Sequence, residues 1–182
     1  MKTAAMWYLA LGAVLSLAAQ GVAAWDYGDA PAGYGLSTAY YTGPEKFGFT
    51  WTDDASNPVT PAWTGDEDDG LAAAGWNGVW VAGSSTNEIS IYAYCGGFFE
   101  YVTMFVDFND NGNFNDPGER IDYPGNPIPG TNGVITFTGI SVPSVSYSLN
   151  ATNGIGVRFS MTYAGVVPGP SGTWTYGEIE DY

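Results

Sequence analysis

Glycine and proline interrupt this 182-residue chain so often that long helices are excluded from most of it: there are 26 glycines and 11 prolines. Proline breaks helices, and glycine weakens them because it loses much backbone freedom on folding. Leucine, a strong helix former, is scarce after residue 24 and occurs there only as Leu36, Leu71 and Leu149. The apolar runs contain Val, Ile, Thr and aromatic residues instead, which favour strands. The sequence therefore predicts an all-β fold.

Four runs alternate between apolar and polar residues with the two-residue period of a half-buried strand. They are 88–94, 101–108, 134–140 and 155–163. In the last run Phe159 and Met161 are expected to face inward, and Arg158, Ser160 and Thr162 outward. Short alternating strands separated by turn residues predict a single β-sandwich. The Gly-, Pro- and Asp-rich segment 25–75 is expected to be largely loop and to cover that sandwich.

The first 24 residues have the pattern of a cleavable signal peptide. Lys2 supplies a positive start, residues 6–19 are mainly apolar, and 22–24 are small residues suited to cleavage. We expect a signal-peptide helix over 1–24, removed on export, and one domain over 25–182. No second apolar run is long enough to cross a bilayer, so we expect a secreted or cell-surface protein without a membrane span in the mature chain.

The charge and two residue counts exclude several classes of function. A net charge of −15 at pH 7, from 19 acidic and four basic residues, repels nucleic acid phosphates and favours divalent cations as partners. Histidine is absent, which excludes Ser-His-Asp and Cys-His catalysis and His-containing zinc sites. Cys95 is the single cysteine, so it forms no internal disulfide, and we expect it to be buried. We expect no enzymatic activity.

Residues 107–119 read Asp-Phe-Asn-Asp-Asn-Gly-Asn-Phe-Asn-Asp-Pro-Gly-Glu. Asp107, Asn109 and Asn111 occupy alternate positions and Gly112 follows, as in the Asp-x-Asp/Asn-x-Asp/Asn-Gly pattern of calcium loops. Calcium takes about six to eight oxygen ligands, which short side chains at alternate positions of a tight loop can supply. The candidate ligands are Asp107, Asn109, Asn111, Asn113, Asn115, Asp116 and Glu119.

The loop differs from an EF-hand. Glu119 stands at the thirteenth position instead of the twelfth, Pro117 would interrupt an exiting helix, and a strand enters in place of a helix. The alternative is that Asn111-Gly112 merely forms a hairpin turn. We favour calcium because a turn needs two such residues and this loop carries eight Asp, Asn or Glu side chains.

Other acidic residues form a candidate second cluster. Glu178 and Glu180 share one face of an expected strand, so they need a cation, an arginine or hydrogen-bond donors unless water screens them. Arg158 is a candidate partner. The alternative is that these runs are solvated loops. The members of the cluster are Asp26, Asp29, Asp66, Glu67, Asp68, Asp69, Glu178, Glu180 and Asp181.

Four motifs resemble, in their order along the chain, those of the GEVED domain of secreted bacterial surface proteins. They are Asp-Tyr-Gly-Asp-Ala-Pro at 26–31, Gly-Asp-Glu-Asp-Asp-Gly at 65–70, the segment 106–119, and Gly-Glu-Ile-Glu-Asp at 177–181. Arg158 corresponds to the arginine in the strand preceding the signature. Each motif is weak alone, but together they are specific and cover nearly all of residues 25–182. Asn111 replaces the more usual Asp, which removes one charge from the loop.

The resemblance implies an extracellular β-sandwich, often appended to surface proteins or secreted hydrolases, without an established biochemical activity. It also implies a further strand after Tyr182, so the chain either is a fragment or leaves a sheet edge short. We expect a non-enzymatic, calcium-stabilised module of a cell-surface or secreted matrix or adhesion protein. Two alternatives remain: a module that binds polysaccharide on exposed tryptophans, or a filament or adhesin subunit that exchanges strands with neighbouring subunits.

Overall fold

The computed structural model describes residues 24–41, 45–49, 70–75, 80–130, 132–144, 155–163 and 165–182. Within these ranges the all-β class is confirmed. None of the helices described there is long and apolar enough to cross a bilayer. Residues 1–23 of the expected signal peptide lie outside the described ranges. The elements in chain order are β1 (Ala24–Tyr27), the 3-10 helix η1 (Ala32–Tyr34), β2 (Ser37–Tyr41), β3 (Lys46–Phe47), α1 (Gly70–Ala73), β4 (Asn87–Tyr94), β5 (Glu100–Val106), β6 (Arg120–Asp122), β7 (Asn132–Ile140), β8 (Val157–Tyr163), β9 (Gly172–Thr175) and β10 (Gly177–Asp181).

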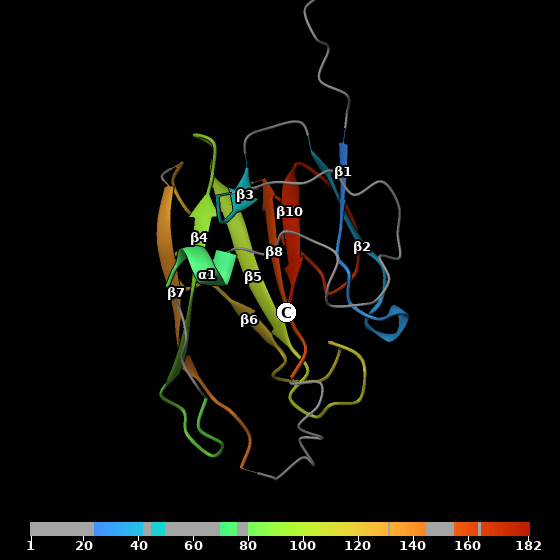
Figure 1. The fold of residues 1–182 in the computed structure, drawn as a ribbon, viewed down its shortest axis with the longest axis vertical. Coiled ribbons are helices and arrows are strands. Elements are labelled where there is room, and N and C mark those ends of the chain that lie inside the picture. The colour runs from blue at the N-terminus through green and yellow to red at the C-terminus, as the bar shows by residue number, and fades with distance from the viewer. Residues whose placement is uncertain are drawn as a thin grey trace, which may run out of the picture.

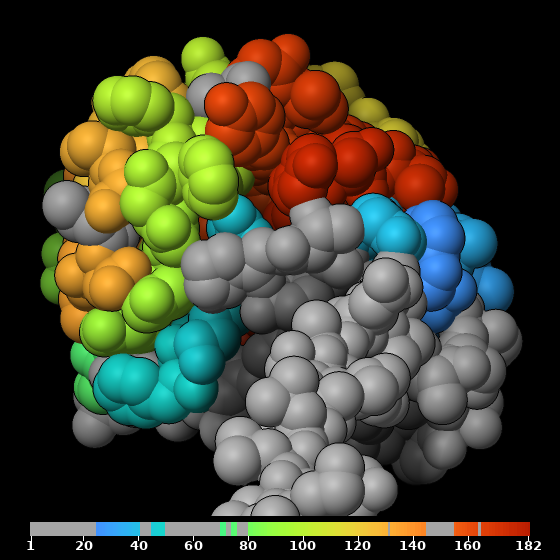
Figure 2. Space-filling model, turned by 90° about the horizontal axis from the view of Figure 1, so that it is seen from above, coloured from blue at the N-terminus to red at the C-terminus, as the bar shows by residue number. Residues whose placement is uncertain are grey.

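The sheet β10-β8-β5-β6 lies in the middle of the fold, and each of its two faces packs against another sheet (Figure 1). The sheet β3-β4-β7 covers one face and encloses the main hydrophobic core with it. The sheet β1-β2-β9 lies on the other face, where Ala39, Trp174 and Ile179 form a smaller core. Figure 2 shows β4 and β7 on one side, β1 and β2 on the opposite side, and the red C-terminal strands between them.

Strand β4 shows why the alternating pattern is informative in the outer layer. Ile89, Ile91 and Ala93 are buried in the main core, while Glu88 is exposed and Tyr92 is half-buried. Strand β7 pairs with it in antiparallel register and follows the same pattern. One face of this sheet packs on the core and the other meets water, so the expected alternation is confirmed.

The expectation that Arg158, Ser160 and Thr162 face outward to solvent is wrong, because all three side chains are fully buried. The alternation itself is correct: Phe159 and Met161 lie in the main core, and the polar residues lie on the opposite face of β8. That face is covered by the layer containing β1, β2 and β9. Strands β5, β8 and β10 of the central sheet are therefore largely buried on both faces, whereas the edge strand β6 is more exposed.

The N-terminal segment is more regular than expected. Residues 24–41 form β1 and β2, which pair in antiparallel fashion, and β2 pairs in parallel with β9. Ala39 lies opposite Trp174 in that parallel register. Residues 24–41 cover the sandwich, as expected, but β1 and β2 do so as strands of a third sheet; residues 42–44 and 50–69 of the expected loop segment lie outside the described ranges.

Candidate metal centre

The 107–119 loop connects two antiparallel neighbours of the central sheet, β5 and β6. The N–H of Val106 donates to the carbonyl of Glu119 at 2.9 Å, which closes the base of the loop. The N–H of Asp107 donates to the carbonyl of Gly156 at 3.0 Å. The loop therefore projects from a fixed base on the central sheet.

Asparagine side chains shape the loop from within. The Oδ1 atoms of Asn109, Asn111 and Asn113 each accept a hydrogen bond from the N–H two residues further on, at 3.1, 3.2 and 2.8 Å. Asp110 (φ 51°) and Gly112 (φ 82°) take left-handed backbone conformations where the chain turns. Much of the loop therefore consists of local turns, as the hairpin-turn alternative expected for Asn111-Gly112. The same turns bring successive amide groups close together.

Asp107 anchors the loop from inside the protein, where its side chain is fully buried. Its Oδ1 accepts the N–H of Asn111 at 3.1 Å, and its Oδ2 accepts the N–H of Gly112 and the hydroxyl of Tyr34, both at 2.8 Å. Burial is the main cause that raises the pKa of the Tyr34 phenol, and the hydrogen bond from its hydroxyl to Asp107 is the second, because the ionised phenol would be desolvated beside a carboxylate. Three donors thus compensate the buried carboxylate.

The N-terminal segment packs directly on the loop. The ring centroids of Tyr34 and Phe114 lie 4.6 Å apart, and both side chains are buried in one cluster with Ala30 and Phe105. A Cβ atom on Gly33 would lie 2.7 Å from the carbonyl oxygen of Gly112, so only glycine allows this approach.

Asp116 and Glu119 supply negative oxygens at the end of the loop. The Oδ2 of Asp116 accepts the side-chain amides of Asn109 at 2.7 Å and Asn111 at 2.5 Å. Glu119 is 2% exposed, and its Oε2 accepts the N–H of Asp116 at 3.1 Å. Its Oε1 is buried and has no hydrogen-bond donor among the described residues. Burial raises the pKa of Glu119, as expected for a carboxylate removed from water.

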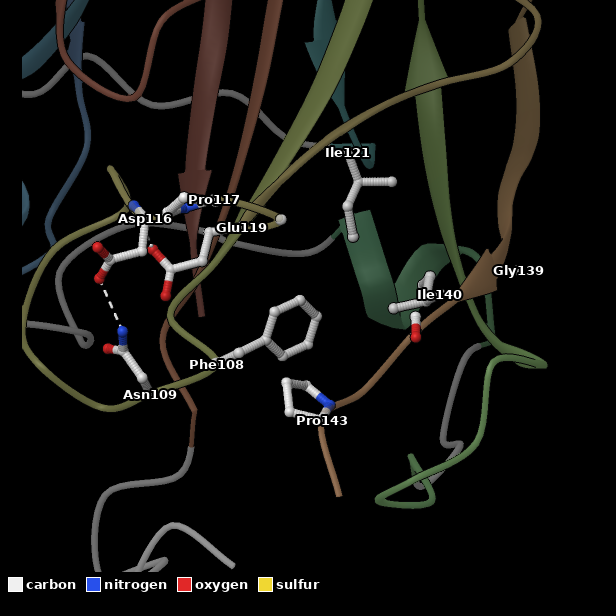
Figure 3. Close-up of a pocket in the computed structure, with 11 residues that line it drawn as sticks. Phe108, Asn109, Asp116, Pro117, Glu119, Ile121, Gly139, Ile140 and Pro143 are labelled. Carbon is white, nitrogen blue, oxygen red and sulfur yellow. Dashed lines mark hydrogen bonds between the residues drawn. The ribbon is translucent and has the colours of Figure 1, made fainter. Parts of the chain in front are cut away.

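An open pocket of about 430 Å³ adjoins this end of the loop (Figure 3). Asn109, Asp116 and Glu119 line one wall, and Ile140 at the end of β7 and Pro143 just after it line the other. The Phe108 ring lies between the polar wall and these two residues (Figure 3). The pocket therefore combines carboxylate and amide oxygens with an apolar surface.

The remaining candidate ligands, Asn113 and Asn115, lie nearer the surface of the loop than Asp107 and Glu119 do. The Nδ2 of Asn113 donates to Oδ1 of Asn111 at 2.5 Å, and Asn115 is exposed. In the part of the chain that the structure describes, no three Asp, Glu or Cys side chains come together as a metal-binding group. A cation in the loop would therefore depend on amide and backbone carbonyl oxygens as well as on carboxylates.

The candidate second cluster is divided between the two faces of β10. Asp26 accepts the N–H of Ile179 at 2.6 Å on the side of the N-terminal sheet, where Asp29 is also buried. Glu178 and Glu180 point to the opposite side: Glu178 accepts the N–H of Phe47, and Glu180 accepts the hydroxyl of Tyr182 at 2.5 Å. Asp66, Glu67, Asp68 and Asp69 lie outside the described residues.

Arg158 pairs with Asp181, and not with Glu178 or Glu180 as the sequence suggested. Its Nε and Nη2 donate to the two carboxylate oxygens of Asp181 at 2.6 and 2.7 Å, and both side chains are fully buried. Arg158 and Asp181 are opposite each other in the β8–β10 register, and alternation turns Glu178 and Glu180 away. The N–H of Ala30 also donates to Asp181, at 2.8 Å, which joins the 26–31 motif to the 177–181 motif.

Two buried glutamates escaped the sequence interpretation. Glu100 is fully buried at the start of β5, and Glu45 is 1% exposed just before β3. The sequence did contain a signal for Glu100. Side chains two and four residues apart in a strand share one face, so Glu100 lies on the same face as the core residues Val102 and Met104. Glu45 stands before a two-residue strand, which offers no comparable pattern.

The comparisons with known proteins bear on the C-terminal half of the chain. The family model of the GEVED domain matches residues 101–182. The match contains the 107–119 loop, Arg158 and the 177–181 motif, whereas the motifs at 26–31 and 65–70 precede it. No curated protein and no solved structure matches the chain. The chain therefore carries a GEVED domain, and its residues 101–182 belong to that family.

Proposed function

We propose that this protein is a non-enzymatic, extracellular β-sandwich module of a cell-surface or matrix protein, in which the 107–119 loop binds calcium and the bound ion stabilises the fold. The β-rich architecture and membership of the GEVED domain family support an extracellular-type module in general.

The buried, donorless Oε1 of Glu119 carries the metal proposal. A desolvated carboxylate oxygen without a donor is costly unless the group is neutralised or meets a cation. Near Glu119, one carboxylate oxygen of Asp116 accepts hydrogen bonds from the side-chain amides of both Asn109 and Asn111. An amide presents either its nitrogen or its oxygen by rotation of its terminal bond, so Asn109 and Asn111 can serve a cation as oxygen donors. Oxygen donors of this kind suit calcium better than softer metals.

The expected stabilisation follows from mass action. Extracellular calcium modules bind with dissociation constants of about 0.1–1 mM. A site of about 0.1 mM in about 1 mM calcium adds about 1.4 kcal/mol to the free energy of unfolding. For a domain of this size that corresponds to a rise in melting temperature of about 3–5 °C.

Thermal unfolding in calcium and in EDTA tests the proposal. We expect calcium to raise the melting temperature of the wild type and to have little effect on Glu119→Gln. In EDTA, Glu119→Gln should be the more stable protein, because the substitution removes a buried, uncompensated charge. Glu88→Gln, at an exposed position on β4, is the control and should respond like the wild type. Identical wild-type melting curves in calcium and EDTA would contradict calcium binding.

Carbohydrate binding is the second candidate, and the pocket beside the loop favours it. Oxygen-rich and apolar walls face each other there, which suits the hydroxyl groups and the C–H face of a sugar. The tryptophans are weaker support, because Trp174 is buried and Trp51, Trp63 and Trp76 lie outside the described residues. Calorimetric titration with neutral oligosaccharides, with and without calcium, tests this function. No heat of binding at millimolar ligand would remove its support.

A further inference from the structure

Two glutamates and the single cysteine lie near one another at one end of the main core, between the central sheet and β3-β4-β7. Lys46 pairs with Tyr94 and Phe47 with Ala93, so the antiparallel register places Glu45 beside Cys95. A turn closed by the N–H of Phe98 and the carbonyl of Cys95, at 2.9 Å, then leads to Glu100 at the start of β5. Glu45 and Glu100 thus come from the two layers that enclose the core.

Neither carboxyl group is compensated in the way that Asp181 is. Glu100 is 0% exposed, and neither of its carboxylate oxygens has a donor among the described residues. Glu45 is 1% exposed, and its Oε2 likewise has no donor there. Two charged carboxylates in these positions would be desolvated and would repel each other, so both cannot be ionised without great cost.

The charged and titratable groups around the pair do not neutralise it. Lys46 is on the other face of β3, where its Nζ donates to the carbonyl of Phe49 at 2.5 Å and lies 5.8 Å from the Tyr94 ring. Glu178 carries a negative charge and accepts the N–H of Phe47, two residues after Glu45. Tyr163, opposite Glu100 on β8, is 44% exposed, and the Cys95 thiol is buried.

We propose that Glu45 and Glu100 share a proton in the folded protein and act as a pH-sensitive latch, which closes this end of the sandwich while the proton is bound and loosens when it leaves. The bound proton removes one of the two repelling charges, and a carboxylic acid can donate a hydrogen bond to a neighbouring carboxylate.

The direction of the pKa shifts agrees with this arrangement. Burial, and next the neighbouring charge of Glu45, raises the pKa of Glu100 from 4.5 to about 8, and burial raises the pKa of Glu45. Burial, together with both glutamates, raises the pKa of the Cys95 thiol to about 12. A group whose pKa is raised by folding contributes its full stabilisation to the folded state when the pH is below the pKa of that group in the unfolded chain. That stabilisation is lost as the pH rises to the folded value, here between pH 4.5 and about 8.

Urea unfolding as a function of pH tests the shared proton. Glu100→Gln replaces the protonated acid with a neutral group of the same shape. We expect the unfolding constant of the wild type, divided by that of this variant, to rise up to about tenfold per pH unit within that window. The matched control Glu88→Gln, exposed on β4, should give a ratio independent of pH. A pH-independent ratio for Glu100→Gln would overturn the proposal.

Infrared spectroscopy gives a measurement that does not depend on the variant's stability. We expect the folded wild type at pH 7 to show the carbonyl absorption of a protonated carboxylic acid, which the urea-unfolded chain at the same pH lacks. Its absence from the folded protein would exclude the shared proton.

The single cysteine reports on the opening itself. We expect iodoacetamide to modify Cys95 faster in the wild type than in Glu100→Gln at pH 9, with both proteins folded. Comparison at one pH cancels much of the thiol's own ionisation. Equal rates would show that loss of the proton does not open this end of the core, and the latch would be wrong.

Discussion

Replacement of Arg158 by glutamine tests whether the buried ion pair between Arg158 on β8 and Asp181 on β10 holds the central sheet to the N-terminal layer. The side chains of Arg158 and Asp181 are 0% exposed and share two hydrogen bonds of 2.6 and 2.7 Å. The Nη1 of Arg158 also donates to the carbonyls of Gly35 at 3.2 Å and Pro170 at 2.8 Å. The guanidinium therefore joins β8 and β10 to the segments that immediately precede β2 and β9.

The expected loss is large because Arg158→Gln leaves Asp181 charged and buried. Breaking a buried ion pair by removing one partner costs about 3–5 kcal/mol. Typical domains are stable by only about 5–15 kcal/mol, so this change should remove a large part of the free energy of unfolding. The same substitution at Arg120 is the control. That residue pairs with Asp122 at 2.8 Å, but the side chains are 40% and 54% exposed, and such pairs contribute about 0–1 kcal/mol.

Urea unfolding followed by tryptophan fluorescence measures both variants, and the double variant Arg158→Gln/Asp181→Asn completes the comparison. The double variant should be more stable than Arg158→Gln alone, because no unpaired charge then remains in the interior. The single variant Asp181→Asn closes the cycle. If Arg158→Gln cost no more than Arg120→Gln, or if the effects of Arg158→Gln and Asp181→Asn simply added up in the double variant, the pair would not act as a buried electrostatic unit.

Two further substitutions test close contacts. Gly177→Ala should destabilise the protein by more than about 2 kcal/mol in urea unfolding, because its φ is 145° and a Cβ would lie 1.9 Å from the carbonyl oxygen of Met161; wild-type stability would contradict that packing. Tyr34→Phe should cost about 1–3 kcal/mol, because Asp107 loses a buried hydroxyl donor. An unchanged melting temperature for Tyr34→Phe would show that the N-terminal segment is not held through this bond.

The alternating pattern of the outer sheet β3-β4-β7 was predictable because one of its faces contacts water and the other contacts the core. In β4 and β7 the alternation of apolar and polar residues follows the difference between core and solvent. Strands β5, β8 and β10 of the central sheet give no such contrast, since both of their faces are buried. Arg158 was assigned to solvent because its burial depends on Asp181, which is a neighbour only after β8 and β10 have paired.

The position of the 107–119 loop at the end of a strand was also predictable, because its Asp, Asn and Gly spacing is local. Its anchoring was not. Tyr34 and Asp107 are 73 residues apart, and no spacing rule relates them. Glu45 was missed for the same reason. The phase of Glu100 in β5 indicates its burial, but only the approach of two layers makes the two glutamates an uncompensated pair.

The bonds between the 26–31 and 177–181 motifs have a consequence for how the protein is made. Asp26 and Ile179 are 153 positions apart, and Ala30 and Asp181 are 151 apart. Because a ribosome releases the chain from its N-terminus, β1 and β2 can pair with each other early, but their contacts with β9 and β10 form only after the last strands have emerged. Contacts of such long separation also slow folding. Export in an unfolded state, with folding after the whole chain has crossed the membrane, would suit this order of assembly.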